Sequence, residues 1–151
     1  NRGCNNIECT GHNNIYLSIH EGPLLKQKTV NPSTIGQHAE QAALQFLTEQ
    51  GLSLITRNYL FKGGEIDLIM HHNQQLIFIE VRFRSHASFG SGAESVTRAK
   101  QQKISKTALH FLQKQPQYAE HEIRFDVLSL SMEHGQYKYH WIEEAFWPGD
   151  G

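Results

Sequence analysis

The stretch from Gly63 to Arg84 constrains the fold most, because two short runs within it alternate between apolar and polar side chains. Side chains two residues apart share one face of a β-strand, so this period predicts two strands. The polar segment His71–Gln75 separates the runs and predicts the connecting turn. We expect an antiparallel hairpin in which Met70 lies opposite Ile77.

In that register two acidic residues of the hairpin, Asp67 and Glu80, lie opposite each other, and Glu65 lies opposite Arg82. Opposed Cβ atoms are only about 5 Å apart, and two carboxylates at that distance repel unless a cation, a proton or a basic partner separates them. One interpretation is a magnesium site, because Mg²⁺ takes carboxylate oxygens together with water and substrate phosphate. The other is a set of weak salt bridges to Arg82 and Arg84 on a solvated sheet face.

Bulk composition limits the class of protein. The chain has 151 residues, 38% hydrophobic and 19% charged, which is typical of one globular domain with a real core. The formal net charge of −1 is no nucleic-acid signature by itself. The sequence shows neither a membrane-spanning apolar run nor a secretory signal pattern, and its only cysteines are Cys4 and Cys9. We therefore expect a cytoplasmic protein without a membrane partner.

Two regions of the chain differ in pattern. Residues 1–33 are rich in Asn, Gly and His without a sustained period, so we expect an irregular N-terminal extension with one short strand at Ile15–Ile19. Residues with zinc-ligand side chains occur there, without the spacing of a common zinc finger: Cys4, Cys9, His12 and His20. Residues 34–151 are expected to form the folded domain.

The periodicity of residues 34–151 predicts an α/β fold with a mixed central β-sheet flanked by helices, in the order α-β-β-β-α-β-β. Helices are expected where apolar residues recur every three or four positions, with Ser33 or Thr34 capping the first and Ser95 the second. The expected elements are a helix to about Gln50, strands at Leu52–Leu60, in the hairpin and at Glu122–Leu130 and Tyr137–Ile142, a helix at Val96–Gln115, and a helical turn at Glu143–Trp147.

The second predicted helix is basic, because no acidic residue occurs between Ser95 and Ala119. Such a face is either an ordinary solvated helix surface or a contact surface for the phosphate backbone of nucleic acid. The polar side chains that we expect to contact DNA, together with Arg84 of the hairpin, are Arg98, Lys100, Gln101, Lys103 and Lys106.

Several motifs resemble those of the YraN family of bacterial endonuclease-like proteins. They are Ile35–Glu40, Arg57–Tyr59, Gly64–Ile69, Phe78–Arg84, Lys100–Gln101 and Arg124–Val127. The resemblance spans roughly Thr34 to Trp147. It implies a restriction-endonuclease-like core of the PD-(D/E)xK nuclease group, similar to Holliday-junction resolvases.

This resemblance also implies an active site. Asp67 and Glu80 would bind Mg²⁺ or Mn²⁺ with the backbone carbonyl of Val81, and Glu40 would be the acidic residue of the first helix. Arg82 stands where the nuclease pattern has lysine. Because arginine does not lose its proton in proteins, Arg82 cannot act as a general base but can stabilise charge on the phosphate.

We therefore expect metal-dependent hydrolysis of phosphodiester bonds in DNA, including branched DNA, by a protein that forms a homodimer by analogy with resolvases. The arginine in place of lysine leaves open a catalytically silent nucleic-acid-binding module of the same fold. A third hypothesis is a protein-interaction scaffold that uses the aromatic residues Tyr137, Tyr139, Trp141 and Trp147.

Overall fold

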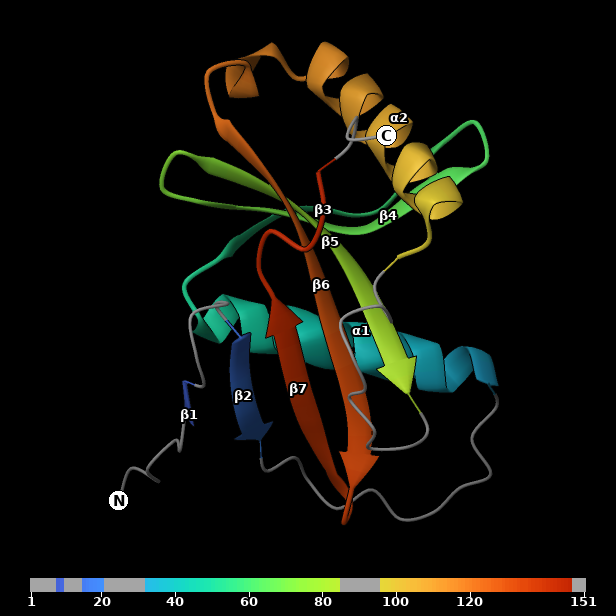
Figure 1. Ribbon diagram of the computed structural model, residues 1–151, viewed down its shortest axis with the longest axis vertical. Coiled ribbons are helices and arrows are strands. Elements are labelled where there is room, and N and C mark those ends of the chain that lie inside the picture. The colour runs from blue at the N-terminus through green and yellow to red at the C-terminus, as the bar shows by residue number, and fades with distance from the viewer. Residues whose placement is uncertain (1–7, 10–14, 21–31, 85–95, 148–151) are drawn as a thin grey trace.

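The computed structural model describes residues 8–9, 15–20, 32–84 and 96–147, and the fold is given for these residues (Figure 1). The helices are α1 (Pro32–Glu49), α2 (Arg98–Lys114) and the short 3-10 helix η2 (Pro116–Tyr118). The strands are β1 (Glu8–Cys9), β2 (Ile15–His20), β3 (Ser53–Phe61), β4 (Gly64–His72), β5 (Gln75–Arg84), β6 (Glu122–Glu133) and β7 (Gln136–Ile142).

One sheet runs through the molecule in the order β1-β2-β7-β6-β5-β4-β3. The pair β5–β6 is parallel and the others are antiparallel, so the sheet is mixed. The predicted order α-β-β-β-α-β-β is confirmed from α1 onward. The short strands β1 and β2 extend the sheet beyond β7 (Figure 1). The division of the chain at residue 33 stays a prediction.

The two longer helices cover opposite faces of the sheet. Alternating strand residues point to one side or the other, and they divide into two apolar clusters. The cluster beneath α1 includes Phe46, Leu47, Met70, Ile77, Ile79, Leu128, Leu130 and Trp141. The cluster beneath α2 includes Ile66, Ile69, Phe78, Val96, Ile104, Phe111, Phe125 and Phe146. Figure 1 shows α1 crossing behind the lower strands and α2 lying over β3 and β4.

The predicted hairpin register is confirmed, because Met70 pairs with Ile77 between β4 and β5. Tight turns fix the hairpins of this sheet. Lys62–Gly63 and His134–Gly135 each have two successive positive φ angles, 41° and 78° in the first and 52° and 76° in the second. Such two-residue loops match the twist of the strands that they join.

Several predicted element ends were wrong. The cap of α2 is Thr97, whose side chain accepts a hydrogen bond from the Lys100 backbone N–H at 3.3 Å, and not Ser95. Strand β6 continues to Glu133, beyond the predicted end at Leu130, because its partner β7 pairs with it up to the turn.

Residues Glu143–Trp147 form a turn followed by irregular structure, and not the predicted helical turn. The Glu144 backbone N–H donates to the Asp126 carboxylate at 3.0 Å. The Ala145 backbone N–H donates to the Phe125 carbonyl at 2.8 Å. These bonds hold the segment alongside β6, which prevents a helical turn.

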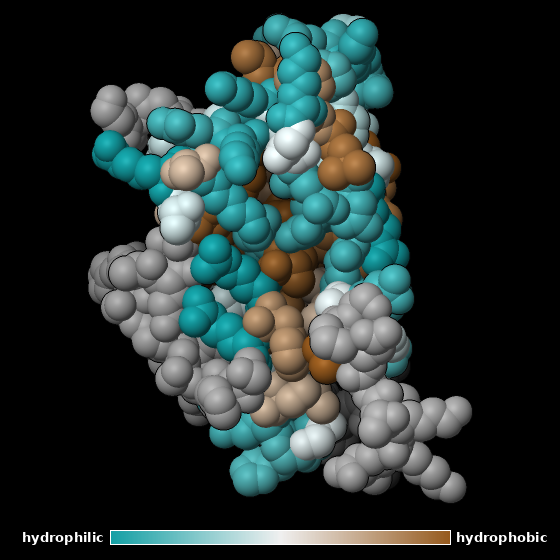
Figure 2. Space-filling view, turned by 90° about the vertical axis from the view of Figure 1, so that its right-hand side faces the viewer, coloured by the Kyte–Doolittle hydropathy of each residue, from teal (hydrophilic) through white to brown (hydrophobic). Residues whose placement is uncertain are grey.

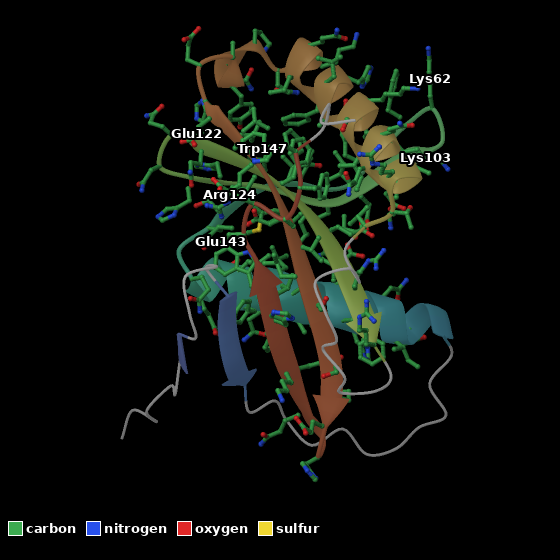
Figure 3. All side chains as sticks on the ribbon, in the orientation of Figure 1. Lys62, Lys103, Glu122, Arg124, Glu143 and Trp147 are labelled. Atoms are coloured by element: carbon green, nitrogen blue, oxygen red, sulfur yellow. The ribbon has the colours of Figure 1, made fainter. Side chains whose placement is uncertain are left out.

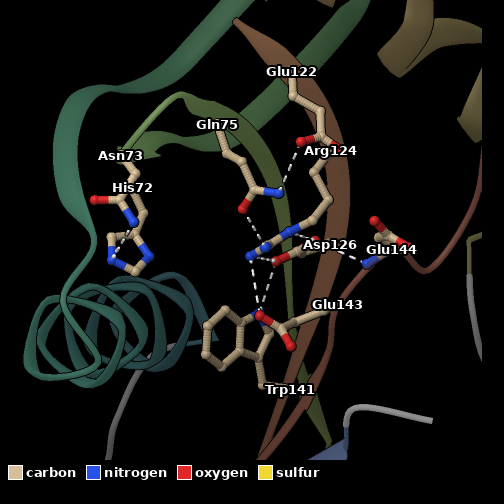
Figure 4. Close-up of polar contacts among 9 residues, drawn as sticks. All are labelled: His72, Asn73, Gln75, Glu122, Arg124, Asp126, Trp141, Glu143 and Glu144. Carbon is tan, nitrogen blue, oxygen red and sulfur yellow. Dashed lines mark hydrogen bonds and ion pairs between the residues drawn. The ribbon is translucent and has the colours of Figure 1, made fainter.

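A buried ionic network centred on Asp126 joins β6 to the start of β5, to β7 and to the segment that follows β7 (Figure 4). Asp126 is 0% exposed and accepts bonds from Arg124 Nε and Nη2 and from Trp141 Nε1, each at 2.9 Å. Arg124 Nη1 also donates to Gln75 Oε1 at 2.9 Å, and its Nη2 lies 3.2 Å from Glu143 Oε1. Asp126 is therefore a structural carboxylate.

The aromatic residues of β7 belong largely to the core. Tyr139 is 2% and Trp141 4% exposed, and the Tyr139 ring stacks on Phe46 with 4.4 Å between centroids. This packing removes the two central members of the surface that the scaffold hypothesis requires. None of the described helices is long and apolar enough to cross a membrane.

Candidate active site

A pocket of about 330 Å³ opens between the N-terminal half of α2 and the ends of β4 and β5. Below it is called the carboxylate pocket. Its lining residues are Gly63, Gly64, Glu65, Asp67, Glu80, Thr97, Ala99, Lys100, Lys103 and Ile104. Lys103 of α2 and Lys62 of the β3–β4 turn lie on the same side of the molecule (Figure 3). That side faces the viewer in Figure 2, where hydrophilic residues cover the upper part of the surface.

The predicted carboxylates meet where two strands separate. The ladder between β4 and β5 ends at the pair Leu68–Ile79, and Asp67 and Glu80 are the next residues on the two strands. The Val81 backbone N–H donates to Asp67 Oδ2 at 2.8 Å, which fixes the orientation of that carboxyl group. Glu80 is only 6% exposed.

Asp67 and Glu80 affect each other electrostatically. Burial of Asp67 and the negative charge of Glu80 raise the Asp67 pKa to about 7. The Val81 N–H and the positive charge of Lys100 act in the opposite direction. A proton or a cation between the two carboxylates therefore reduces the repulsion between Asp67 and Glu80.

Helix α2 places a lysine directly on the acidic pair. The Nζ of Lys100 forms an ion pair with Glu80 Oε1. The Lys100 side chain is 44% exposed and the Glu80 side chain 5%, so the carboxylate lies at the floor of the pocket and the ammonium at its mouth. The sequence had suggested only a phosphate contact for Lys100, and this ion pair was missed.

A signal for it exists in the sequence. The first turn of α2 contains no acid but carries Arg98 and Lys100. Cations near a helix N-terminus oppose the helix dipole, so such a cluster indicates an anion supplied from elsewhere.

The close approach of α2 to β4 depends on Gly64. A Cβ atom at this position would lie 2.3 Å from Thr107 Oγ1 and 3.0 Å from the Lys103 carbonyl oxygen. Thr107 is fully buried, and its hydroxyl donates to that same carbonyl at 2.8 Å, so neither atom is free to move aside. Glycine is therefore required for α2 to lie close enough to bring its lysines over the carboxylates.

Glu40, the predicted acid of the first helix, lies outside the lining of the carboxylate pocket. Its carboxylate accepts bonds from Asn58 Nδ2 at 2.9 Å and from Arg57 Nη2 at 3.3 Å. Asn58 itself has a positive φ of 50° within β3. In this arrangement Glu40 joins α1 to β3.

Arg82 and Arg84 follow Glu80 on the same face of β5, but neither is among the described residues that line the pocket. In the parallel ladder they lie opposite Ser129 and Ser131 of β6. The β4–β5 ladder has already ended at this level, so Arg82 is not brought opposite Glu65 by strand pairing.

The remaining predicted DNA contacts lie on α2. Arg98, Lys103 and Lys106 are exposed. Gln101 instead donates its side-chain N–H to the Val96 carbonyl at 2.9 Å, within the loop that precedes the helix.

Comparison with known proteins identifies the family. The chain matches the uncharacterised protein family UPF0102 over residues 39–130. It belongs to this family. The resemblance to YraN proteins is thereby confirmed, and the matched region contains Glu40, Asp67, Glu80 and Lys100.

Relatives within UPF0102 cover most of the chain. A UPF0102 protein of Saccharophagus degradans is 52% identical over 111 residues, which is 74% of this chain and 91% of that protein. One from Pseudomonas putida is 42% identical over 77% of this chain and 95% of its own length. A solved structure of Pyrococcus furiosus SfsA in complex with Ca²⁺ covers 85% of this chain and 76% of its own, with 15% identity and a TM-score of 0.33. A similarity at that level supports no conclusion about this UPF0102 protein.

Two side chains of the carboxylate pocket, Asp67 and Glu80, could hold a divalent metal ion. Among the described residues no group of three or more His, Cys, Asp and Glu side chains could hold a metal ion. Mg²⁺ commonly takes only one or two carboxylates from a protein and completes its shell with water and phosphate oxygens. Asp67 and Glu80, which repel each other in a pocket of sufficient size, provide that donor set.

Proposed function

We propose that this UPF0102 protein is a metal-dependent endonuclease that hydrolyses phosphodiester bonds in DNA. The observation that carries the proposal is the acidic pair Asp67 and Glu80 at the separating ends of β4 and β5, with Lys100 of α2 ion-paired to Glu80. Two carboxylates and a lysine around one small pocket match the requirements of phosphoryl transfer to water.

In this proposal Asp67 and Glu80 hold Mg²⁺ or Mn²⁺, and the Val81 carbonyl adds a third oxygen, as the YraN resemblance implies. A bound ion would supply positive charge to the scissile phosphate and lower the pKa of a coordinated water molecule. The Val81 N–H keeps the Asp67 carboxylate oriented toward the pocket. Glu40 acts at most through its contacts with Arg57 and Asn58.

The reaction adds water across one P–O bond. The water oxygen bonds to phosphorus, the bond from phosphorus to the sugar oxygen breaks, and the proton released by water balances the proton that the leaving oxygen takes up. No redox partner is needed. Positive charge from Lys100 or Arg82 would stabilise the charge that develops on the phosphate oxygens.

DNA would approach along the N-terminal half of α2. Arg98, Lys103 and Lys106 are exposed on this helix, and Lys103 also lines the pocket. Such side chains bind phosphates without reading the base sequence. Contacts from Arg84 and Gln101, a preference for branched DNA, and a homodimer that matches a two-fold junction belong to the same proposal.

A silent DNA-binding module is the second candidate, and the arginine at position 82 favours it, because the nuclease pattern has lysine there. Such a module would keep the basic face of α2 and would bind DNA without a metal. Its binding would weaken steeply with salt and would not change in Asp67→Asn.

A cleavage assay separates the two candidates. Single-stranded, duplex, flap and four-way junction DNA are incubated with Mg²⁺ or Mn²⁺ and with the wild type, Glu80→Gln or Glu65→Gln. The third protein is the matched control, because Glu65 is an exposed acid of the same pocket. Cutting by the wild type and by Glu65→Gln that is lost in Glu80→Gln supports the endonuclease. Equal cutting by wild type and Glu80→Gln, or no cutting together with metal-independent binding, refutes it.

A further inference from the structure

We propose that Lys100 of α2 provides the positive charge that the nuclease pattern places at Arg82, and that its ion pair with Glu80 is a resting contact which opens when metal and DNA bind. This inference rests on the proposed function, since it assigns a catalytic residue to the same pocket. It differs from the resemblance, which points to the residue two positions after Glu80.

The strand geometry disfavours Arg82 for this role. Arg82 shares a face of β5 with Glu80 and lies two residues further along the strand. At that level β5 has left its ladder with β4, the strand that carries Asp67. Arg82 lies opposite Ser129 of β6 and is not among the described lining residues of the carboxylate pocket.

Lys100 lines the carboxylate pocket and contacts Glu80, whose side chain is buried there. Its ammonium group contacts the carboxylate of Glu80, and Lys100 lines the same pocket as Asp67, the other proposed metal ligand. Its backbone N–H is held by the Thr97 cap at 3.3 Å, which fixes the root of the side chain in the first turn of α2. The long flexible side chain can still swing, because it is 44% exposed at the pocket mouth.

Charge explains why the ion pair would open. In the resting protein the Lys100 ammonium partly neutralises Glu80. A divalent cation held by the Asp67 and Glu80 carboxylates would repel the ammonium group from Glu80. A phosphate of the incoming DNA would give Lys100 a new anionic partner at the pocket mouth. The negative charge on the phosphate oxygens increases in the transition state, so Lys100 would bind the transition state more strongly than the ground state.

The packing of α2 against β4 positions Lys100 at the carboxylates. Gly64 allows the helix to lie against β4, because a Cβ atom at this position would overlap Thr107 Oγ1 and would contact the Lys103 carbonyl oxygen tightly. Sheet and helix therefore contribute different halves of one site: β4 and β5 supply the carboxylates, and α2 supplies the cation.

The test compares Lys100→Gln, Lys100→Arg and Arg82→Gln in the full chain, with Lys114→Gln as the control. Lys114→Gln removes the same charge at the other end of α2, about 20 Å from Lys100 along the helix. We expect Lys100→Gln to lower the single-turnover cleavage rate roughly 100-fold at saturating DNA, since it removes a transition-state contact. Lys100→Arg should recover part of that rate, and Arg82→Gln should lose less than Lys100→Gln does.

A second readout does not depend on cutting. Without DNA, Lys100→Gln should bind Mn²⁺ about three- to tenfold more tightly than the wild type, because no ammonium group competes for Glu80. Lys114→Gln should bind Mn²⁺ like the wild type. Circular dichroism melting of each variant verifies that it is folded.

The outcomes separate this inference from the proposed function. If the wild type cuts in an Asp67-dependent way but Lys100→Gln behaves like Lys114→Gln, or Arg82→Gln loses more, the role of Lys100 is refuted and the endonuclease stands. If the wild type does not cut, the proposed function and the catalytic role fall together, and the Mn²⁺ comparison decides the resting contact. Unchanged or weaker Mn²⁺ binding by Lys100→Gln overturns that contact.

Discussion

Replacing Asp67 by asparagine should make the protein more stable at alkaline pH, although it removes a proposed catalytic group. The Asp67 pKa is raised from 3.8 to about 7 in the folded protein. Between these values the folded state binds a proton that the unfolded chain has released, so stability falls as pH rises through this window. Above pH 7 the folded protein holds two repelling carboxylates, Asp67 and Glu80.

The size of the effect follows from the shift. One pKa unit corresponds to about 1.4 kcal/mol, so the shift sets an upper limit of about 4 kcal/mol. Water at the open pocket screens part of the repulsion, and we expect about 2 kcal/mol. Asparagine keeps a side-chain oxygen that can accept the Val81 N–H, so the variant loses the charge and retains the local hydrogen bond.

Urea unfolding of wild type and Asp67→Asn at pH 5 and pH 8 measures this difference. We expect the variant to gain about 2 kcal/mol over the wild type at pH 8 and much less at pH 5. The control is Glu65→Gln, an exposed acid of the same pocket, which should change stability by less than about 0.5 kcal/mol at either pH. A variant that is equally or less stable than the wild type at pH 8 would refute the account of the acidic pair.

Further predictions concern packing, the buried network and metal binding. Gly64→Ala should destabilise the fold by about 2 kcal/mol in urea unfolding, because its Cβ would overlap Thr107, whereas Gly36→Ala on α1 meets no atom within 4 Å and should stabilise it by about 0.5–1 kcal/mol. Asp126→Ala should lower stability by about 3–5 kcal/mol, because the buried Arg124 guanidinium loses both of its hydrogen bonds to the Asp126 carboxylate; a melting temperature close to that of the wild type would contradict this. Mn²⁺ affinity should rise between pH 6 and pH 8, because the ion must displace the proton of Asp67; calorimetry in buffers of different ionisation enthalpy would show the released proton, and a pH-independent affinity would be the contrary result.

The β4–β5 hairpin was predictable because apolar and polar side chains alternate with a period of two, which restricts the register in which the strands can pair. A shift of the register by one residue would turn Ile77 and Ile79 from the core beneath α1 to the other face. The facing of Asp67 and Glu80 follows from the same register. Strong alternation therefore predicted both the strands and the acidic pair.

The contribution of α2 to the site was not predictable in the same way. The helical period of the sequence predicted the buried face of α2 with Ile104, Ala108 and Phe111. It did not predict how closely the helix approaches β4. That distance depends on a contact between Gly64 and Thr107, which are far apart in sequence. The ion pair of Lys100 follows from this packing, so it became visible only in three dimensions.

The last segment of the domain shows how a tertiary contact overrides a local pattern. Residues Glu143–Trp147 have a composition that suits a helical turn, but the Asp126 carboxylate and the Phe125 carbonyl accept the backbone N–H groups of Glu144 and Ala145. No local pattern in the sequence indicates these partners.

Titration of Mn²⁺ into the DNA-free protein, followed by calorimetry or by the signal of free Mn²⁺, tests the proposed site most directly. We expect one Mn²⁺ per chain at pH 8, with affinity at least about tenfold weaker in Glu80→Gln and in Asp67→Asn, because each removes one ligand carboxylate. Glu65→Gln should bind like the wild type. Equal Mn²⁺ affinity in all four proteins would contradict a metal site at Asp67 and Glu80.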